Sequence, residues 1–199
     1  MNSILHKLAL VASLAMILPV AACELLDEAC ENEAPSDKVG QVYVDTYEAS
    51  RVNATAQTQG VGITQACNYA NTLPWNNVTY EDARNACLDA GKRLCTKDEW
   101  IAACGTAFPY GAGYKAGTCN DSGSIAATGS KTGCKSSVGA FDMSGNLYEW
   151  AEGGYLMGGS YNTEKEELSC TSAKQISDPV SYTPTPSVGF RCCKDASTL

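Results

Sequence analysis

Cysteine has the most chemical capacity of any residue in this 199-residue chain, which contains eleven cysteines and one histidine. The histidine, His6, precedes an apolar segment that has the features of an export signal. If that segment is removed, no histidine remains for a catalytic triad, a histidine-ligated zinc site or a facial-triad iron site. The sequence also lacks any Cys-x-x-Cys pair, which argues against zinc knuckles and thioredoxin-type redox chemistry.

The first 23 residues are typical of an exported lipoprotein. Lys7 is followed by an apolar run over residues 8–20, and Val20-Ala21-Ala22-Cys23 resembles a bacterial lipobox. The pattern predicts cleavage of a signal peptide, residues 1–22, and attachment of acyl chains to Cys23, which would hold the protein at a membrane. By resemblance to Gram-negative lipoproteins, Glu24 after the cysteine favours the outer membrane of the cell envelope, and it does not indicate which face of that membrane. The alternative is ordinary secretion, with Cys23 merely near the cleavage site.

The remaining cysteines predict a disulfide framework. Eleven cysteines less Cys23 leaves ten, and an even number in an exported chain is typical of paired thiols, here up to five bridges. The net charge of −8 argues against a nucleic-acid partner, because such a partner requires a basic surface. With 44% apolar residues, the chain can bury a core.

The cysteines are distributed over elements that the pattern of apolar residues predicts. Residues 23–38 form an acidic tether, with six acids and one base after Cys23. Residues 39–47 alternate between apolar and polar positions, which is typical of a strand. The segments 52–72 and 105–139 are rich in Gly, Thr, Ser or Asn and are expected to be loops. Further short strands are expected at 146–150, 155–161 and 187–193.

Two helices have clear start and stop signals. Thr79 can cap a helix that ends at Gly91, and Thr96 with Glu99 forms a capping box for a helix that ends at Gly105. The residues expected to face inward are Ala83, Ala86, Cys87, Ala90, Trp100, Ala103 and Cys104. We expect Trp75 and Trp150 in the core as well. Two helices with several short strands around one disulfide-linked core place the chain in the α+β class.

Seven motifs in a fixed order make the chain similar to the formylglycine-generating enzyme, or sulfatase-modifying factor, domain family. They are VDTYEAS at 44–50, PWNNVTYEDA at 74–83, GKRLCTKDEW at 91–100, PYG at 109–111, DMSGNLYEW at 142–150, GGSY at 158–161 and GFRC at 189–192. The resemblance implies a variant of the C-type-lectin fold with two helices and short antiparallel strands. It implies a domain over residues 39–195, followed by a tail at 196–199.

The resemblance also implies structural calcium. The ligands would be the side chains of Asp142 and Glu149 and the carbonyls of Gly145 and Leu147, a donor set of hard oxygens that suits this ion. The alternative is that Asp142 caps a turn and that Glu149 is a surface residue, with no ion bound. A second family site would involve Asn120 and Asp121, although the rest of its ligand set cannot be located in the shortened stretch that follows.

Disulfide pairings follow partly from the resemblance. It pairs Cys87 with Cys192, and it pairs Cys104 with a cysteine after the GGSY motif, which here is Cys170. For the other six cysteines many connectivities are possible, and the following arrangement is one of them. Its pairs are Cys119 with Cys134, Cys95 with Cys193, and Cys30 with Cys67.

The family oxidises a substrate cysteine to formylglycine with two cysteines that bind copper(I). The positions that would carry those cysteines here are Thr163 and Leu168, and neither can ligate copper. Ser160 matches a family active-site serine. An oxidase would therefore need Cys170 to be free and a second thiol from elsewhere, so copper is not expected. A related branch that attaches sulfur to histidine derivatives uses histidine ligands, which a mature chain without histidine cannot supply.

These observations favour a lipid-anchored, non-catalytic, calcium-stabilised binding module for a protein, peptide or glycan. A disulfide-locked framework that presents variable loops can recognise a ligand without chemistry. The short connection between Trp150 and Gly158 favours a shallow surface site. Two alternatives remain: a copper-dependent oxidase and an envelope scaffold whose partner is another surface protein.

Overall fold

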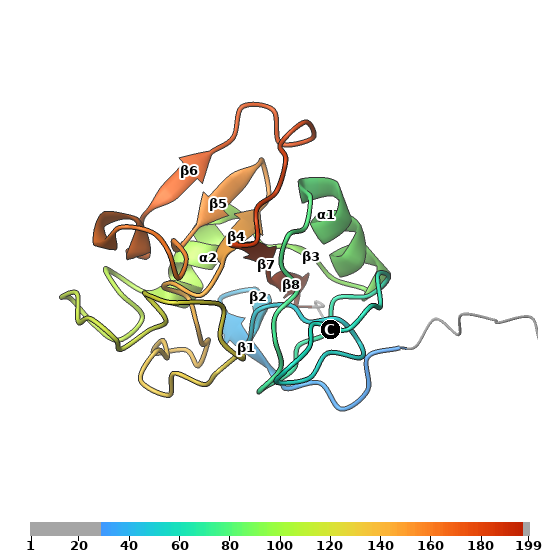
Figure 1. Ribbon diagram of the computed structural model, residues 1–199, viewed down its shortest axis with the longest axis horizontal. Coiled ribbons are helices and arrows are strands. Elements are labelled where there is room, and N and C mark those ends of the chain that lie inside the picture. Colours follow the sequence, from blue (N-terminus) through green and yellow to red (C-terminus); the bar gives the residue numbers. More distant parts are fainter. Residues whose placement is uncertain (1–28, 197–199) are drawn as a thin grey trace, which may run out of the picture.

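Figure 1 shows the computed structural model of the chain, which describes residues 29–196. These residues contain two α-helices and eight short strands. The strands form two four-stranded sheets with the orders β1-β2-β8-β3 and β6-β5-β4-β7. This arrangement confirms the α+β class. The predicted signal peptide, Cys23 and the end of the predicted tail lie outside the described residues.

The first sheet is antiparallel throughout and is built from both ends of the domain. It contains β1 (Ser36–Val39), β2 (Val42–Asp45), β3 (Arg93–Leu94) and β8 (Cys192–Asp195). The single strand predicted over 39–47 is wrong, because Gly40 adopts a φ of +61° and turns the chain into the β1–β2 hairpin. The folded body therefore begins within the segment 23–38 that was expected to be a tether.

The second sheet is mixed. It contains β4 (Tyr148–Ala151), β5 (Tyr155–Met157), β6 (Ala173–Gln175) and β7 (Val188–Phe190), and β4 pairs in parallel with β7. The expectation of antiparallel strands alone is wrong for this pair. The strand expected at 155–161 stops at Met157, because Gly158 and Gly159 have positive φ. The strand expected at 187–193 is divided at Arg191 between the two sheets.

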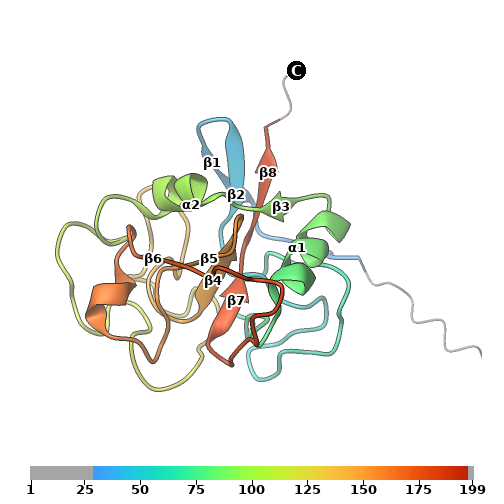
Figure 2. The same cartoon turned by 90° about the horizontal axis from the view of Figure 1, so that it is seen from above.

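Both predicted helices are present with their predicted N-caps. Helix α1 (Tyr80–Asp89) begins after Thr79, whose side chain accepts a hydrogen bond from the Asp82 N–H. Helix α2 (Lys97–Cys104) begins with the Thr96–Glu99 capping box. Figure 2 shows the two helices on either side of β2 and β8. A short 3-10 helix, η1 (Lys165–Leu168), was not predicted.

The core consists of two groups of apolar side chains. One contains Trp75, Trp150 and Phe190 beside α1, and the other contains Trp100, Met143 and Met157 beside α2. All three tryptophans are buried, as expected. In the described part of the chain no helix is both long enough and apolar enough to cross a membrane.

Five disulfides connect these elements, and they include both pairings that the resemblance implies, while the other three are those of the arrangement given as one among many. The bridges are Cys30–Cys67, Cys87–Cys192, Cys95–Cys193, Cys104–Cys170 and Cys119–Cys134. Adjacent Cys192 and Cys193 on β8 attach α1 and the turn that leads into α2 covalently to the first sheet. No free thiol remains among residues 29–196.

Candidate binding site

The positions at which the family would carry copper-binding cysteines hold no metal-binding side chain. The Thr163 hydroxyl accepts from the Ser160 N–H at 3.0 Å and donates to the Ser160 carbonyl at 3.2 Å. Leu168, at the end of η1, is buried. Cys170 is bonded to Cys104. Ser160 itself is fully buried and donates to Asn162 Oδ1 at 2.7 Å, so its hydroxyl is not presented to a substrate.

A buried ion pair lies where the two sheets meet. Arg191, between β7 and β8, donates from Nε to Glu149 Oε2 and from an Nη atom to Oε1, both at 2.7 Å. Trp100 Nε1 donates to the same Oε2 at 2.7 Å. Both members of the pair are essentially inaccessible to solvent. The pair joins β4 to the residue at which the chain passes from one sheet to the other.

Glu48 adds a second buried carboxylate, which the sequence did not single out. It accepts from the Leu147 N–H at 3.0 Å and from the Asn146 side chain. Burial raises the pKa of Glu48 well above its ordinary value, and the neighbouring carboxylates of Asp142 and Glu149 raise it further. The contacts of Glu48 join residues about a hundred positions apart, so no local pattern reveals them. The only sequence signal for Glu48 was its place in the VDTYEAS motif.

Asp142 is also buried, and its backbone has a φ of +58°. Its Oδ2 accepts from the Gly129 N–H at 2.7 Å. Burial raises the pKa of Asp142 to about 6, although the Gly129 hydrogen bond and Arg191 oppose the shift. Three carboxylates therefore share one guanidinium in this cluster.

The predicted calcium ligands do not fit a calcium ion in the arrangement that the side chains adopt. Both Glu149 oxygens accept hydrogen bonds from buried cationic or indole donors, and the positive Arg191 would lie beside the ion. Calcium stays a prediction of the resemblance, and the observed partner of Glu149 is Arg191.

The second predicted calcium position is likewise engaged in internal hydrogen bonds. Asn120 donates to Asn146 Oδ1 at 2.8 Å and to the Ser124 carbonyl at 2.9 Å. Asp121 Oδ2 accepts from the Tyr114 hydroxyl at 2.6 Å and from the Gly117 N–H at 3.0 Å. These contacts order the loop between α2 and β4.

That loop forms a hollow of about 440 Å³ at the surface, beside the Cys104–Cys170 bridge. Its lining combines the aromatic side chains Phe108 and Tyr110 with the polar residues Lys135 and Ser136. The Cys170 N–H donates to the Ala107 carbonyl at 2.8 Å, so the wall of the hollow is hydrogen-bonded to the segment that follows η1. A site held by a disulfide and hydrogen bonds needs little reordering to bind.

Three aromatic rings form a continuous row, of which Phe108 and Tyr110 line the hollow and Tyr114 lies beyond it. Phe108 stacks on Tyr110 with ring centroids 5.6 Å apart, and it lies 5.9 Å from Tyr114, which is 39% exposed. Three lysines and one aspartate lie between residues 105 and 141 in a chain of net charge −8, and one of these lysines, Lys135, lines the hollow. Aromatic faces with polar neighbours can stack on and hydrogen-bond to a sugar or a peptide.

Comparison with known protein families gives one match that covers most of the chain. The model described as the sulfatase-modifying factor enzyme 1-like domain matches residues 36–196. The match begins at the first residue of β1, in agreement with the start of the folded body. A search of curated proteins gave no match.

Solved structures share the fold at low sequence identity. PvdO from Pseudomonas aeruginosa is 14% identical with a TM-score of 0.52, over 77% of this chain and 80% of that chain. The P3c variant of the Major Tropism Determinant is 15% identical with a TM-score of 0.59, over 86% of this chain and 55% of that chain. This chain thus spans about half of the tropism determinant. Treponema denticola variable protein 1 is 13% identical with a TM-score of 0.50, over 84% and 93%.

Proposed function

The chain belongs to the sulfatase-modifying factor enzyme 1-like family, and from this membership we propose that it is a non-catalytic binding module held at the cell envelope. The observation that carries the proposal is the chemistry of the copper-binding positions. Thr163 and Leu168 stand where thiolates are required, and Cys170 is consumed by its bridge to Cys104. A copper(I) oxidase needs soft thiolate ligands, and every cysteine among residues 29–196 is oxidised.

The five disulfides place the domain in an oxidising, extracytoplasmic compartment. The finer part of the proposal is a lipid anchor at Cys23, in the outer membrane, which rests on the lipobox-like sequence. The anchor would keep the module at one surface, where a ligand of modest affinity is bound repeatedly rather than lost to solution.

The hollow beside the Cys104–Cys170 bridge is the proposed binding site. Its two half-buried rings, Phe108 and Tyr110, continue at the surface in the exposed Tyr114 and support a glycan or peptide ligand, and Lys135 supports an acidic group on that ligand. Two structures with this fold are named for tropism determination and for variability, and neither name describes a reaction. The ligand of this chain is proposed from its own aromatic and basic side chains.

Binding to arrays of glycans and peptides tests this proposal with a matched pair of variants. Tyr114→Ala should weaken binding to any ligand that the wild-type protein retains, because it removes an exposed ring of the row. Tyr43→Ala serves as the control, since Tyr43 is 38% exposed but lies on β2. Equal loss in both variants, or no loss in either, would remove the hollow as the binding site.

A further inference from the structure

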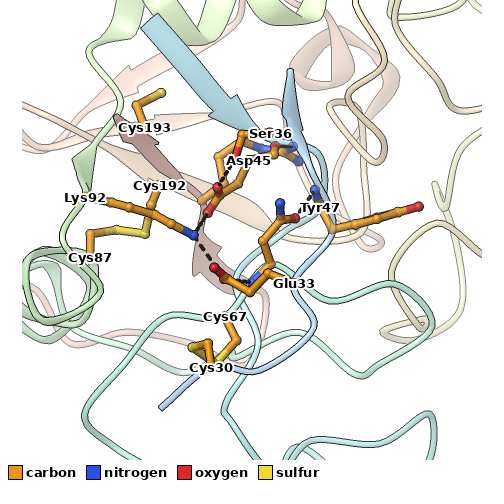
Figure 3. A network of polar contacts seen from close by, with 12 residues as sticks. Cys30, Glu33, Ser36, Asp45, Tyr47, Cys67, Cys87, Lys92, Cys192 and Cys193 are labelled. Atoms are coloured by element: carbon orange, nitrogen blue, oxygen red, sulfur yellow. Dashed lines mark hydrogen bonds and ion pairs between the residues drawn. A yellow bond between two sulfur atoms is a disulfide. The ribbon is translucent and has the colours of Figure 1, made fainter. Parts of the chain in front are cut away.

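The segment that leads from the predicted anchor into the domain is firmly fastened (Figure 3). Cys30 is bonded to Cys67, and Glu33 pairs with Lys92 at 3.0 Å. Lys92 also pairs with Asp45 on β2 at 3.0 Å. The chain therefore leaves the body at Cys30, at a fixed place on its surface.

The distance from this exit to the predicted anchor is short. Six residues lie between Cys23 and Cys30, so the two Cα atoms are separated by at most about 25 Å when the chain is fully extended. The face of the domain around Cys30 must therefore lie close to the membrane if Cys23 carries lipid. The loop that Cys67 closes belongs to this face.

That loop is unusual in charge and in exposure. Residues 52–80 contain no Asp, Glu, Lys or Arg, although 18% of the whole chain is charged. Val61 and Ile63 are 81% and 74% exposed, more than any other large apolar side chain of the described residues. Aliphatic side chains in water are unfavourable by an amount that grows with their exposed area.

The tip is held in a defined shape rather than left to fluctuate. Asn53 Oδ1 accepts from the Val61 N–H at 2.9 Å and from the Gly62 N–H at 3.1 Å. An Nη atom of Arg51 donates to the Gly62 carbonyl at 2.6 Å. These hydrogen bonds fix the backbone of the tip, and both aliphatic side chains remain exposed to solvent.

The tip also lies near the exit of the N-terminal segment. Ile63 is four residues from Cys67, whose disulfide partner is the exit residue Cys30. A surface hollow of about 340 Å³ lies between the two segments, lined by Ala29, Glu31, Val52 and Tyr69. In Figure 1 the segment between β6 and β7 lies at the top of the molecule, whereas the N-terminal segment leaves at the right, beside these loops.

We propose that the Val61–Ile63 tip inserts into the surface of the lipid bilayer that holds Cys23 and forms a second point of attachment. The inference rests on the lipid anchor of the proposed function. Two aliphatic side chains would bind a bilayer weakly alone, but an anchor a few residues away gives them a high effective concentration at that surface. The domain would then have one fixed orientation, with the uncharged loop of residues 52–80 toward the lipid.

The charges favour a zwitterionic lipid surface over a protein partner. The loop of residues 52–80 brings no ionic group of its own to neutral headgroups, although Arg51 and Glu31 lie beside it, whereas protein partners usually offer charges at their rim. Glu24, Asp27 and Glu28 in the connecting segment would be repelled by anionic lipid. Insertion should therefore be strongest in phosphatidylethanolamine or phosphatidylcholine vesicles and weaker when anionic lipid is added.

Fluorescence of the lipidated full-length protein in vesicles tests the proposal. In Ile63→Trp, reconstituted into phosphatidylcholine vesicles, we expect the added tryptophan emission to shift to shorter wavelength and to be quenched by brominated acyl chains. The three native tryptophans are buried and provide a constant background. Val180→Trp is the control, because Val180 is 60% exposed in the segment between β6 and β7; its emission should not change.

Hydrogen exchange of the wild-type protein gives a second readout that needs no substitution. The amides of residues 60–64 should exchange more slowly in vesicles than in detergent, whereas those of residues 177–182 should not. Mass spectrometry of the acyl chains on Cys23 separates the two ways of failing. An acylated protein that stays with the vesicles but shows no quenching at position 63 overturns the inference alone; a protein without acyl chains overturns the anchor itself. A shift to shorter wavelength that requires a second protein, without quenching by brominated acyl chains, would overturn the inference and assign the tip to that protein.

Discussion

Arg191 is shared by three buried carboxylates, which belong to Glu48, Asp142 and Glu149. Its side chain is paired directly with Glu149, and its positive charge opposes the rise in pKa of the other two. Burial disfavours the charged forms of Glu48 and Asp142 because it removes them from water. One guanidinium cannot neutralise three buried carboxylates, so repulsion between the carboxylates disfavours the charged forms further. The three carboxylates therefore all accept hydrogen bonds, but their total negative charge exceeds the positive charge of Arg191.

Replacement of Asp142 by Asn should stabilise the domain at neutral pH. The folded-state pKa of Asp142 is about 6, above the value of 3.8 for a free carboxyl. Between these values the folded state binds more protons than the unfolded state, so this group's stabilisation is complete below pH 4 and is lost as the pH rises through 6. At pH 7 the cost is on the order of 2–3 kcal/mol. Asn keeps the acceptor for Gly129 and tolerates the positive φ.

Chemical denaturation at pH 4 and pH 7 measures this effect. The free energy of unfolding of Asp142→Asn should exceed that of the wild-type protein at pH 7 and approach it at pH 4. A variant that is less stable than the wild-type protein at pH 7 would show that the Asp142 charge is needed there, as a bound cation would require.

At the scale of elements, the N-terminal segment is held by contacts with residues far away in the sequence. Lys92, between α1 and β3, has a side chain that is 9% exposed, and it pairs with Asp45, whose side chain is 2% exposed. Desolvation raises the pKa of Asp45, and the Lys92 charge opposes that rise. The ion pair thus connects the β1–β2 hairpin to the end of α1.

Lys92→Ala should destabilise the domain substantially. It leaves the Asp45 carboxylate buried without a countercharge, and removal of one partner of a buried pair typically costs about 3–5 kcal/mol. Lys174→Ala removes an exposed lysine of β6 and should change the free energy of unfolding by less than about 0.5 kcal/mol. Urea denaturation with the disulfides intact compares the two. Equal stability of both variants would mean that the Lys92 pair does not hold the segment.

The sequence predicted the elements whose signals are local and missed those whose cause is distant. Thr79 and Thr96 indicate the starts of both helices, because each capping side chain accepts a hydrogen bond from the backbone N–H three residues later. β3 has two residues and shows no period. The β1–β2 turn was missed because the alternation of apolar and polar residues over 39–47 indicates one strand that continues through Gly40. The Glu149–Arg191 pair joins residues 42 positions apart, and no local pattern distinguishes two buried charges from two exposed ones.

The aromatic hollow illustrates the same limit at the candidate site. Phe108, Tyr110 and Tyr114 lie in a segment that the sequence predicted as a loop, and nothing in their spacing shows that the rings form a row. The Cys104–Cys170 bridge positions this segment, and that pairing came from the family resemblance. The absence of thiols at Thr163 and Leu168, in contrast, was visible as soon as the GGSY motif was aligned.

At the scale of the whole molecule, five disulfides and a buried ion pair hold a chain with little regular secondary structure. We expect this framework to be stable without calcium, because Arg191 already occupies the Glu149 carboxylate. The melting temperature of the wild-type protein should then be the same in calcium and in chelator. Since an ion that binds the folded state alone raises the melting temperature, a higher value in calcium would restore the ligand set that the resemblance implies.

The central claim is that this domain has the family fold without the family's copper-dependent oxidation of cysteine. The most direct measurement incubates the purified wild-type protein with copper, a reductant, oxygen and a sulfatase-type cysteine peptide, and follows the peptide by mass spectrometry. The account predicts that the peptide keeps its cysteine, because Thr163, Leu168 and the disulfide-bonded Cys170 offer copper(I) no thiolate pair. Formation of the peptide aldehyde by the wild-type protein, and its absence in a heat-denatured control, would contradict the claim.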